Sequence, residues 1–117
     1  MREREERFHV ETIVSDGAVC VRAVGVIDIA TVAAFRAALW AAPARPELRV
    51  DLSDVRVLSA AGVRTLVAAR LWVRAQGGDL VLLDPPPVVE RVLRATGLRR
   101  VIPVVVDSAP ERLLAAV

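Results

Sequence analysis

Apolar and polar positions alternate over the first part of the chain, as they do in strands that bury one face. Two β-branched runs cover 8–14 and 18–24, and the turn-forming residues 15–17 (Ser-Asp-Gly) separate them. This arrangement predicts a β-hairpin, and Gly25 then breaks the pattern. The alternating positions that share one side of the second run are Val19, Val21 and Ala23.

The apolar spacing then changes to the period of a helix that packs on a core. The segment 30–40 is rich in Ala and contains Leu and Phe, and prolines at 43 and 46 end it. Asp28 or Thr31 is expected to cap its start. The apolar residues at helical spacing in this segment are Val32, Phe35, Ala38 and Leu39.

Strand and helix patterns alternate over the rest of the chain. Strands are predicted at 48–52, 80–83 and 101–106. Helices are predicted at 61–76, 87–95 and 110–116, with glycines ending the first two. The order ββαβαβαβα predicts an α/β fold with a mixed sheet of about five strands and helices mostly on one face.

The helix expected over 61–76 presents two apolar faces at about 100° per residue. The face expected to meet the core carries Gly62, Leu66, Ala69 and Val73. A second face carries Val63, Val67 and Leu71, interleaved with Arg64, Arg70 and Arg74. Apolar residues mixed with arginine favour a protein interface. The alternative is that a neighbouring helix covers this face and the arginines extend from its edge.

The charge balance does not indicate a nucleic-acid partner. Sixteen basic residues against 14 acidic ones give a net charge of +2. All the basic residues are arginine, and no lysine or tyrosine buffers the alkaline range, so this small surplus raises the pI to about 9.9. The chain has only four aromatic residues to stack on bases. We therefore expect no nucleic-acid binding.

The residues that could carry chemistry are few. Cys20 and His9 are the only cysteine and histidine, which leaves no disulfide framework, no thiolate or His-rich metal site and no triad. Asp28 and Asp51 suit either acid–base or metal chemistry, or hydrogen bonds in turns and at a helix start. We expect the second role for both, and we expect neither an enzyme nor a cofactor.

No apolar run is long enough to cross a bilayer, so we expect no membrane insertion. Residues 1–7 form a charged N-terminal tail without the apolar segment of a secretory signal. A cytoplasmic location and a single domain over 8–117 are expected. The composition leaves monomer and homodimer both open.

Four stretches, in order and at matching spacing, resemble a known family. They are GVID at 25–28 followed by Thr31, VDLSDV at 50–55, LSAAGV at 58–63, and GG at 77–78 followed by 80–85 and by TGL at 96–98. The chain is identified as a member of the STAS domain family, which occurs in sulfate transporters and bacterial anti-sigma factor antagonists. The resemblance implies a single STAS-like domain over nearly the whole chain.

The resemblance also implies a function and a departure from it. Antagonists of this family bind an anti-sigma factor of the serine-kinase type and free its sigma factor, and phosphorylation of one serine releases the partner. The position of that serine is Ala60, which has no hydroxyl. Ser59 replaces the preceding aspartate, and Gly25-Val26 lacks the usual glutamate. The family's switch is therefore missing or displaced.

We expect the partner to bind the 58–62 loop and the start of the helix that follows it. Ser59 is expected to cap that helix, and the alternative is that it is phosphorylated in place of residue 60. The alternative function is that of a constitutive assembly module in a transporter or a stress-signalling complex. The expected partner-binding residues are Asp28, Leu58, Ser59, Ala60, Ala61, Gly62, Val63, Arg64 and Val67.

Overall fold

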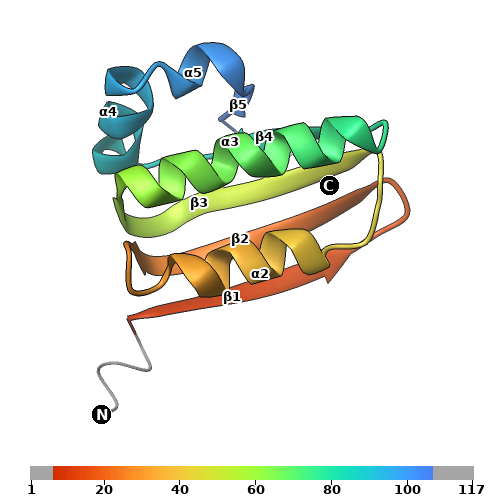
Figure 1. Ribbon diagram of the computed structural model, residues 1–117, viewed down its shortest axis with the longest axis horizontal. Helices are drawn as coiled ribbons and strands as arrows, with labels where there is room; N and C mark the ends of the chain where they lie inside the picture. The colour runs from red at the N-terminus through yellow and green to blue at the C-terminus, as the bar shows by residue number, and fades with distance from the viewer. Residues whose placement is uncertain (1–6, 107–117) are drawn as a thin grey trace, which may run out of the picture.

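The computed structural model describes residues 7–106, which form one mixed sheet with helices packed on it (Figure 1). The strands are β1 (Phe8–Val14), β2 (Ala18–Ile27), β3 (Glu47–Leu58), β4 (Asp79–Leu83) and β5 (Val104–Val105). The helices are α2 (Val32–Ala41), α3 (Ala60–Ala75), α4 (Pro87–Ala95) and α5 (Leu98–Val101). The strand order is β1-β2-β3-β4-β5, with β1 antiparallel to β2 and the other pairs parallel. The predicted α/β fold with a mixed five-stranded sheet is confirmed.

The core lies between the sheet and the helices α2 and α3, which Figure 1 shows over the same face. Every second residue of β2 is buried, including Val19, Val21 and Ala23 as the alternation predicted. On α2 the buried residues are Phe35 and Leu39. On α3 the predicted core residues Gly62, Leu66, Ala69 and Val73 are all buried. The helical periods in the sequence therefore locate the core correctly.

The third strand is longer than the sequence predicted. We expected 48–52, whereas β3 continues to Leu58. Two register shifts against β2 place extra residues in its second half. These bulges leave successive residues exposed, which breaks the alternation that marks a strand. The exposed pairs are Ser53 with Asp54 and Arg56 with Val57.

Two expectations near the end of the chain are corrected. Val101 ends the short helix α5 and does not begin the last strand, which is only Val104–Val105. The cause is Gly97, whose left-handed φ of 77° ends α4 and starts a new helical turn. The helix predicted at 110–116 lies outside the described residues.

The sequence pattern suggested that the strand ends at Gly25, but Gly25 lies inside β2. Its φ of +109° favours glycine. An added Cβ would lie 2.0 Å from the Arg7 carbonyl oxygen, which accepts a hydrogen bond from the Val26 N–H at 2.9 Å. The missing side chain therefore lets the segment before β1 hydrogen-bond to β2.

We predict that Gly25→Ala lowers the free energy of unfolding by about 2 kcal/mol or more, because a backbone clash adds to the strained φ. Urea unfolding followed by circular dichroism measures this change. Gly17→Ala is the matched control, because an added Cβ there meets nothing within 4 Å. A change no larger than that of Gly17→Ala would contradict the close approach of Arg7.

Candidate functional site

The candidate site lies at the edge of the sheet where the parallel strands end. β2 leads into α2 and β3 leads into α3 at this edge, which is on the left in Figure 1. Ile27 and Leu58, the last residues of these two strands, are paired in register. Open α/β sheets bind their ligands outside the carboxyl ends of the strands.

Ser59 is the whole connection between β3 and α3. Its N–H donates to the Ile27 carbonyl at 2.9 Å, so it joins the ends of the two strands. Its hydroxyl oxygen accepts from the Gly62 N–H at 3.4 Å, which confirms the predicted N-cap. The expected 58–62 loop is accordingly wrong, because Leu58 ends the strand and Ala60 begins the helix.

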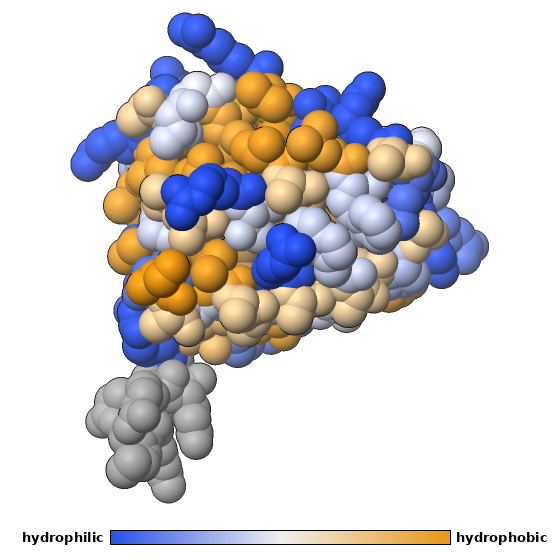
Figure 2. All heavy atoms as spheres, viewed as in Figure 1, coloured by the Kyte–Doolittle hydropathy of each residue, from blue (hydrophilic) through white to orange (hydrophobic). Residues whose placement is uncertain are grey.

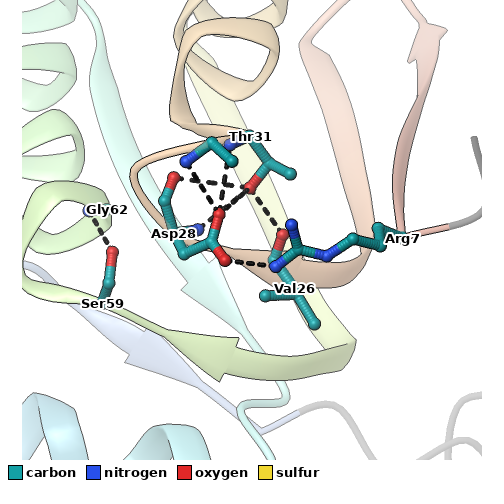
Figure 3. A network of polar contacts seen from close by, with 7 residues as sticks. Arg7, Val26, Asp28, Thr31, Ser59 and Gly62 are labelled. Atoms are coloured by element: carbon teal, nitrogen blue, oxygen red, sulfur yellow. Dashed lines mark hydrogen bonds and ion pairs between the residues drawn. The ribbon is translucent and has the colours of Figure 1, made fainter. Parts of the chain in front are cut away.

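Asp28 organises the turn between β2 and α2 (Figure 3). One carboxylate oxygen, Oδ1, accepts from the N–H groups of Ala30 at 2.9 Å and Thr31 at 3.2 Å. The other, Oδ2, pairs with the guanidinium of Arg7. The hydroxyl of Thr31 donates to the Val26 carbonyl oxygen at 2.7 Å and accepts from the Asp28 N–H at 2.9 Å. Asp28 therefore orders the turn before α2, as one of its two expected roles required. The expected side-chain cap is wrong, because Thr31 is the N-cap residue and no side chain makes a capping bond to this helix.

These contacts shift the acidity of Asp28. Desolvation raises the pKa of its carboxyl, but the hydrogen bond and charge of Arg7 lower it, as do the bonds from Ala30 and Thr31. The balance leaves the pKa of Asp28 below its usual range. The carboxylate is thus ionised and engaged with this protein's own groups.

The expected partner-binding residues divide into a surface set and a supporting set. Ala60 and Arg64 are exposed, whereas Ser59, Ala61 and Val67 are half-buried. Arg64 has no carboxylate partner within residues 7–106. The buried residues Leu58, Gly62 and Val63 hold the helix start in place.

The second face of α3 is smaller than the sequence predicted. Val63 is buried in the core, because the buried stripe of a packed helix is wider than one row of side chains. Arg70 binds Asp79 at 3.2 Å, and Arg74 lies 3.6 Å from the same carboxylate, so both point to the start of β4. Leu71 remains 66% exposed.

Two residues at this edge were not in the expected set. Ile29 is 81% exposed and directly follows Asp28. Figure 2 shows a hydrophobic area over this start of α2. Its signal in the sequence was an isoleucine in a turn where polar residues are usual. Arg7, assigned to the tail, reaches the site because Gly25 lets the chain approach, a contact that carries no local pattern.

The other chemistry-bearing residues do not converge on this edge. His9 lies on β1 near Glu11, and Cys20 is half-buried on β2. Asp51 accepts from the Ser53 N–H at 2.9 Å and hydroxyl at 2.7 Å. No group of three His, Cys, Asp or Glu side chains that could hold a metal ion occurs among the described residues. None of the described helices is long and apolar enough to span a membrane.

A family model described as "Mlab, STAS domain" matches residues 12–107. Among solved structures, an anti-sigma factor antagonist from Mycobacterium paratuberculosis is 27% identical, with 94% of each chain covered and a TM-score of 0.79. No match was found among curated protein sequences.

Two further structures share the fold at lower identity. The Bacillus cell fate determinant SpoIIAA in its phosphorylated form is 21% identical over 94% of this chain and 99% of that one, with a TM-score of 0.67. A putative anti-sigma factor antagonist from Thermotoga maritima is 21% identical over 91% and 92%, with a TM-score of 0.70.

We predict that Asp28→Asn reduces the loss of stability in acid. A lowered pKa in the folded state contributes stability that is complete above the pKa of the unfolded chain. That contribution is lost as the pH falls through the folded value. Unfolding in urea between pH 7 and about pH 2 should show a smaller decline for Asp28→Asn than for the wild type.

Asp16→Asn is the matched control, since Asp16 is exposed in the hairpin turn. A decline in acid that is equal in both variants and the wild type would contradict the role of the Arg7–Asp28 pair.

Proposed function

The chain belongs to the STAS domain family, and we propose that it is a regulatory binding protein of the anti-sigma factor antagonist type. Its surface around Ile29, Ala60 and Arg64 binds an anti-sigma factor of the serine-kinase type, which then releases its sigma factor. Competition between two partners suffices for this, with no bond made or broken. The Mycobacterium paratuberculosis relative, described as an anti-sigma factor antagonist, supports the proposal.

The composition of this surface supports protein binding. Ile29 and Ala60 follow two paired strand ends, so an exposed isoleucine and an exposed methyl group belong to the same edge. Arg64 lies one turn further along α3. An apolar centre with an adjoining arginine is the usual composition of an interface core. The half-buried carboxylate of Asp28 contributes by fixing the turn that presents Ile29.

The observation that carries the proposal is the exposed alanine at the first position of α3. The N–H groups and the dipole at the helix N-terminus would stabilise a phosphate here, so the fold would tolerate its charge. The same charge would weaken the complex with a docked partner. Ala60 has no oxygen to carry a phosphate. The surface therefore stays neutral at its centre, and the protein stays competent to bind.

Ser59 does not take over this role in the proposal. Its hydroxyl oxygen is engaged as the N-cap of α3, and its side chain is half-buried. A phosphate on Ser59 would have to replace the bond from Gly62. We therefore treat Ser59 as a structural residue of the site. We also propose that the protein acts in the cytoplasm of a bacterium.

A second candidate is a constitutive assembly module of a transporter or a stress-signalling complex. The same alanine favours it, because an assembly subunit needs no phosphorylation switch. This candidate predicts a stable complex with transporter or scaffold proteins, whereas the first predicts capture of a kinase-type anti-sigma factor.

We predict that Ala60→Glu abolishes capture of the anti-sigma factor from a lysate of the native organism. The new carboxylate lies at a helix N-terminus, which favours negative charge, so the fold is retained while the interface gains an uncompensated charge. Affinity purification read by mass spectrometry should show at least about a tenfold loss relative to the wild type.

Ala37→Glu, at an exposed position in the middle of α2, is the matched control and should capture as the wild type does. Equal capture of an anti-sigma factor by Ala60→Glu would place the interface elsewhere. Recovery of transporter or scaffold proteins in its place would favour the assembly module.

A second prediction concerns the switch. After incubation with the captured anti-sigma factor and ATP, the wild type should carry no phosphate in the peptide that contains residues 59 and 60, because residue 60 has no hydroxyl. Ala60→Ser should gain one phosphate there, detected by intact-protein mass spectrometry. Phosphate on Ser59 of the wild type would show that the switch is displaced and would contradict constitutive binding.

A further inference from the structure

The positive charge of the chain is concentrated on α4 and α5. Residues 90–100 contain four arginines and one glutamate, a net charge of +3, whereas the whole chain carries +2. The rest of the chain therefore carries −1. Figure 2 shows long hydrophilic side chains projecting over the part of the surface that Figure 1 labels α4 and α5. This charge lies outside the set of residues that we assign to the partner site.

The fold draws three of these arginines together. The left-handed turn at Gly97 reverses the chain between the two helices and brings α5 back beside α4. A hollow of about 330 Å³ results, and it is lined by Arg94, Gly97, Arg99 and Arg100.

One carboxylate holds two of the three guanidinium groups. Arg94 Nε donates to Glu90 Oε2 at 3.0 Å, and Arg99 Nε forms an ion pair with the same oxygen at 2.7 Å. The Glu90 side chain is 22% exposed, so it lies behind the arginines and anchors them. Within the described residues no hydrogen bond is made by the terminal amino groups of Arg94 and Arg99, so these groups can serve as donors to a ligand.

The single glutamate does not neutralise the hollow. Three arginines and one glutamate leave a charge of +2, and like charges this close repel each other unless an anion joins them. Arg100 and the neighbouring Arg91 have no carboxylate partner in the part of the chain that the structure describes. A phosphate monoester at neutral pH carries a charge of about −1.5 to −2, which matches the surplus.

We propose that the corner between α4 and α5 is a binding site for a phosphate group, presented either by a small soluble phosphate compound or by a lipid head group. Arg94 and Arg99 supply pre-positioned donors, and Arg100 supplies the third charge. None of the four aromatic side chains lies on α4 or α5, so the corner offers no ring on which a base would stack. The site is independent of the proposed partner surface.

The first test is a titration of isotope-labelled full-length protein with inorganic phosphate and pyrophosphate at low ionic strength, followed by amide NMR. We expect saturable shifts confined to residues near 94–100, with a Kd of about 1 mM or tighter. Arg100→Gln should weaken binding about tenfold without unfolding the protein, because Arg100 makes no ion pair within residues 7–106. Arg56→Gln removes the same charge from an exposed position on β3 and should change the Kd less than twofold.

Vesicle co-sedimentation distinguishes the two sources. Binding to vesicles that contain phosphatidic acid, whose head group is a phosphate monoester, but not to phosphatidylcholine vesicles, lost in Arg100→Gln, would assign the phosphate to a lipid head group. Binding to pyrophosphate alone would assign it to a soluble compound.

Three results would overturn the proposal. They are the absence of binding to either probe, an equal loss in Arg56→Gln and Arg100→Gln, and tighter binding of a hexaglutamate peptide to the same residues. The last result would make the corner a docking site for an acidic protein segment.

Discussion

Helix α3 begins where it does because Gly62 has no side chain. An added Cβ would lie 2.6 Å from Leu58 Cδ1 and 2.8 Å from Ile27 Cγ2, both in the buried core. The first turn of the helix therefore rests directly on the ends of β2 and β3. Once it does, the Ser59 N–H reaches the Ile27 carbonyl oxygen, and a single residue suffices to connect strand to helix. The position of the whole candidate surface follows from this close contact.

The same contact separates the structural residues of the edge from those that face outward. The side-chain oxygens of Ser59 and Asp28 accept hydrogen bonds from backbone N–H groups, and Asp28 also pairs with Arg7. These contacts fix the β2–α2 and β3–α3 connections and leave little hydrogen-bonding capacity for a partner. The exposed residues of this edge do not fix the connections: they are Ile29, Ala60 and Arg64. Because these connections are already ordered, a partner that binds this edge would not have to order them, which lowers the entropic cost of binding. This arrangement is the basis of our proposal that the edge binds its partner continuously.

The sequence predicted the parts of the molecule that depend on local period and on short motifs. The hairpin, the buried stripe of α3, the helix Pro87–Ala95 and the cap at Ser59 all rest on such signals. The second half of β3 was not predicted, because its bulges expose residues in pairs and remove the alternation of buried and exposed positions. The pair between Arg7 and Asp28 could not be seen, since it joins residues 21 positions apart through the space left at Gly25. Similarly, the burial of Val63 depends on how α3 packs, which helical spacing alone does not determine.

Hydrogen exchange of the protein with and without the captured anti-sigma factor tests the central claim most directly. The residues that we propose to contact the partner lie on two short segments, 28–31 and 59–64, at one edge of the sheet. Binding there should slow amide exchange in both segments together and leave β1 and the outer face of α2 unchanged. Protection confined to β1 or to α2, with none at the start of α3, would contradict the assignment of this edge as the partner-binding site.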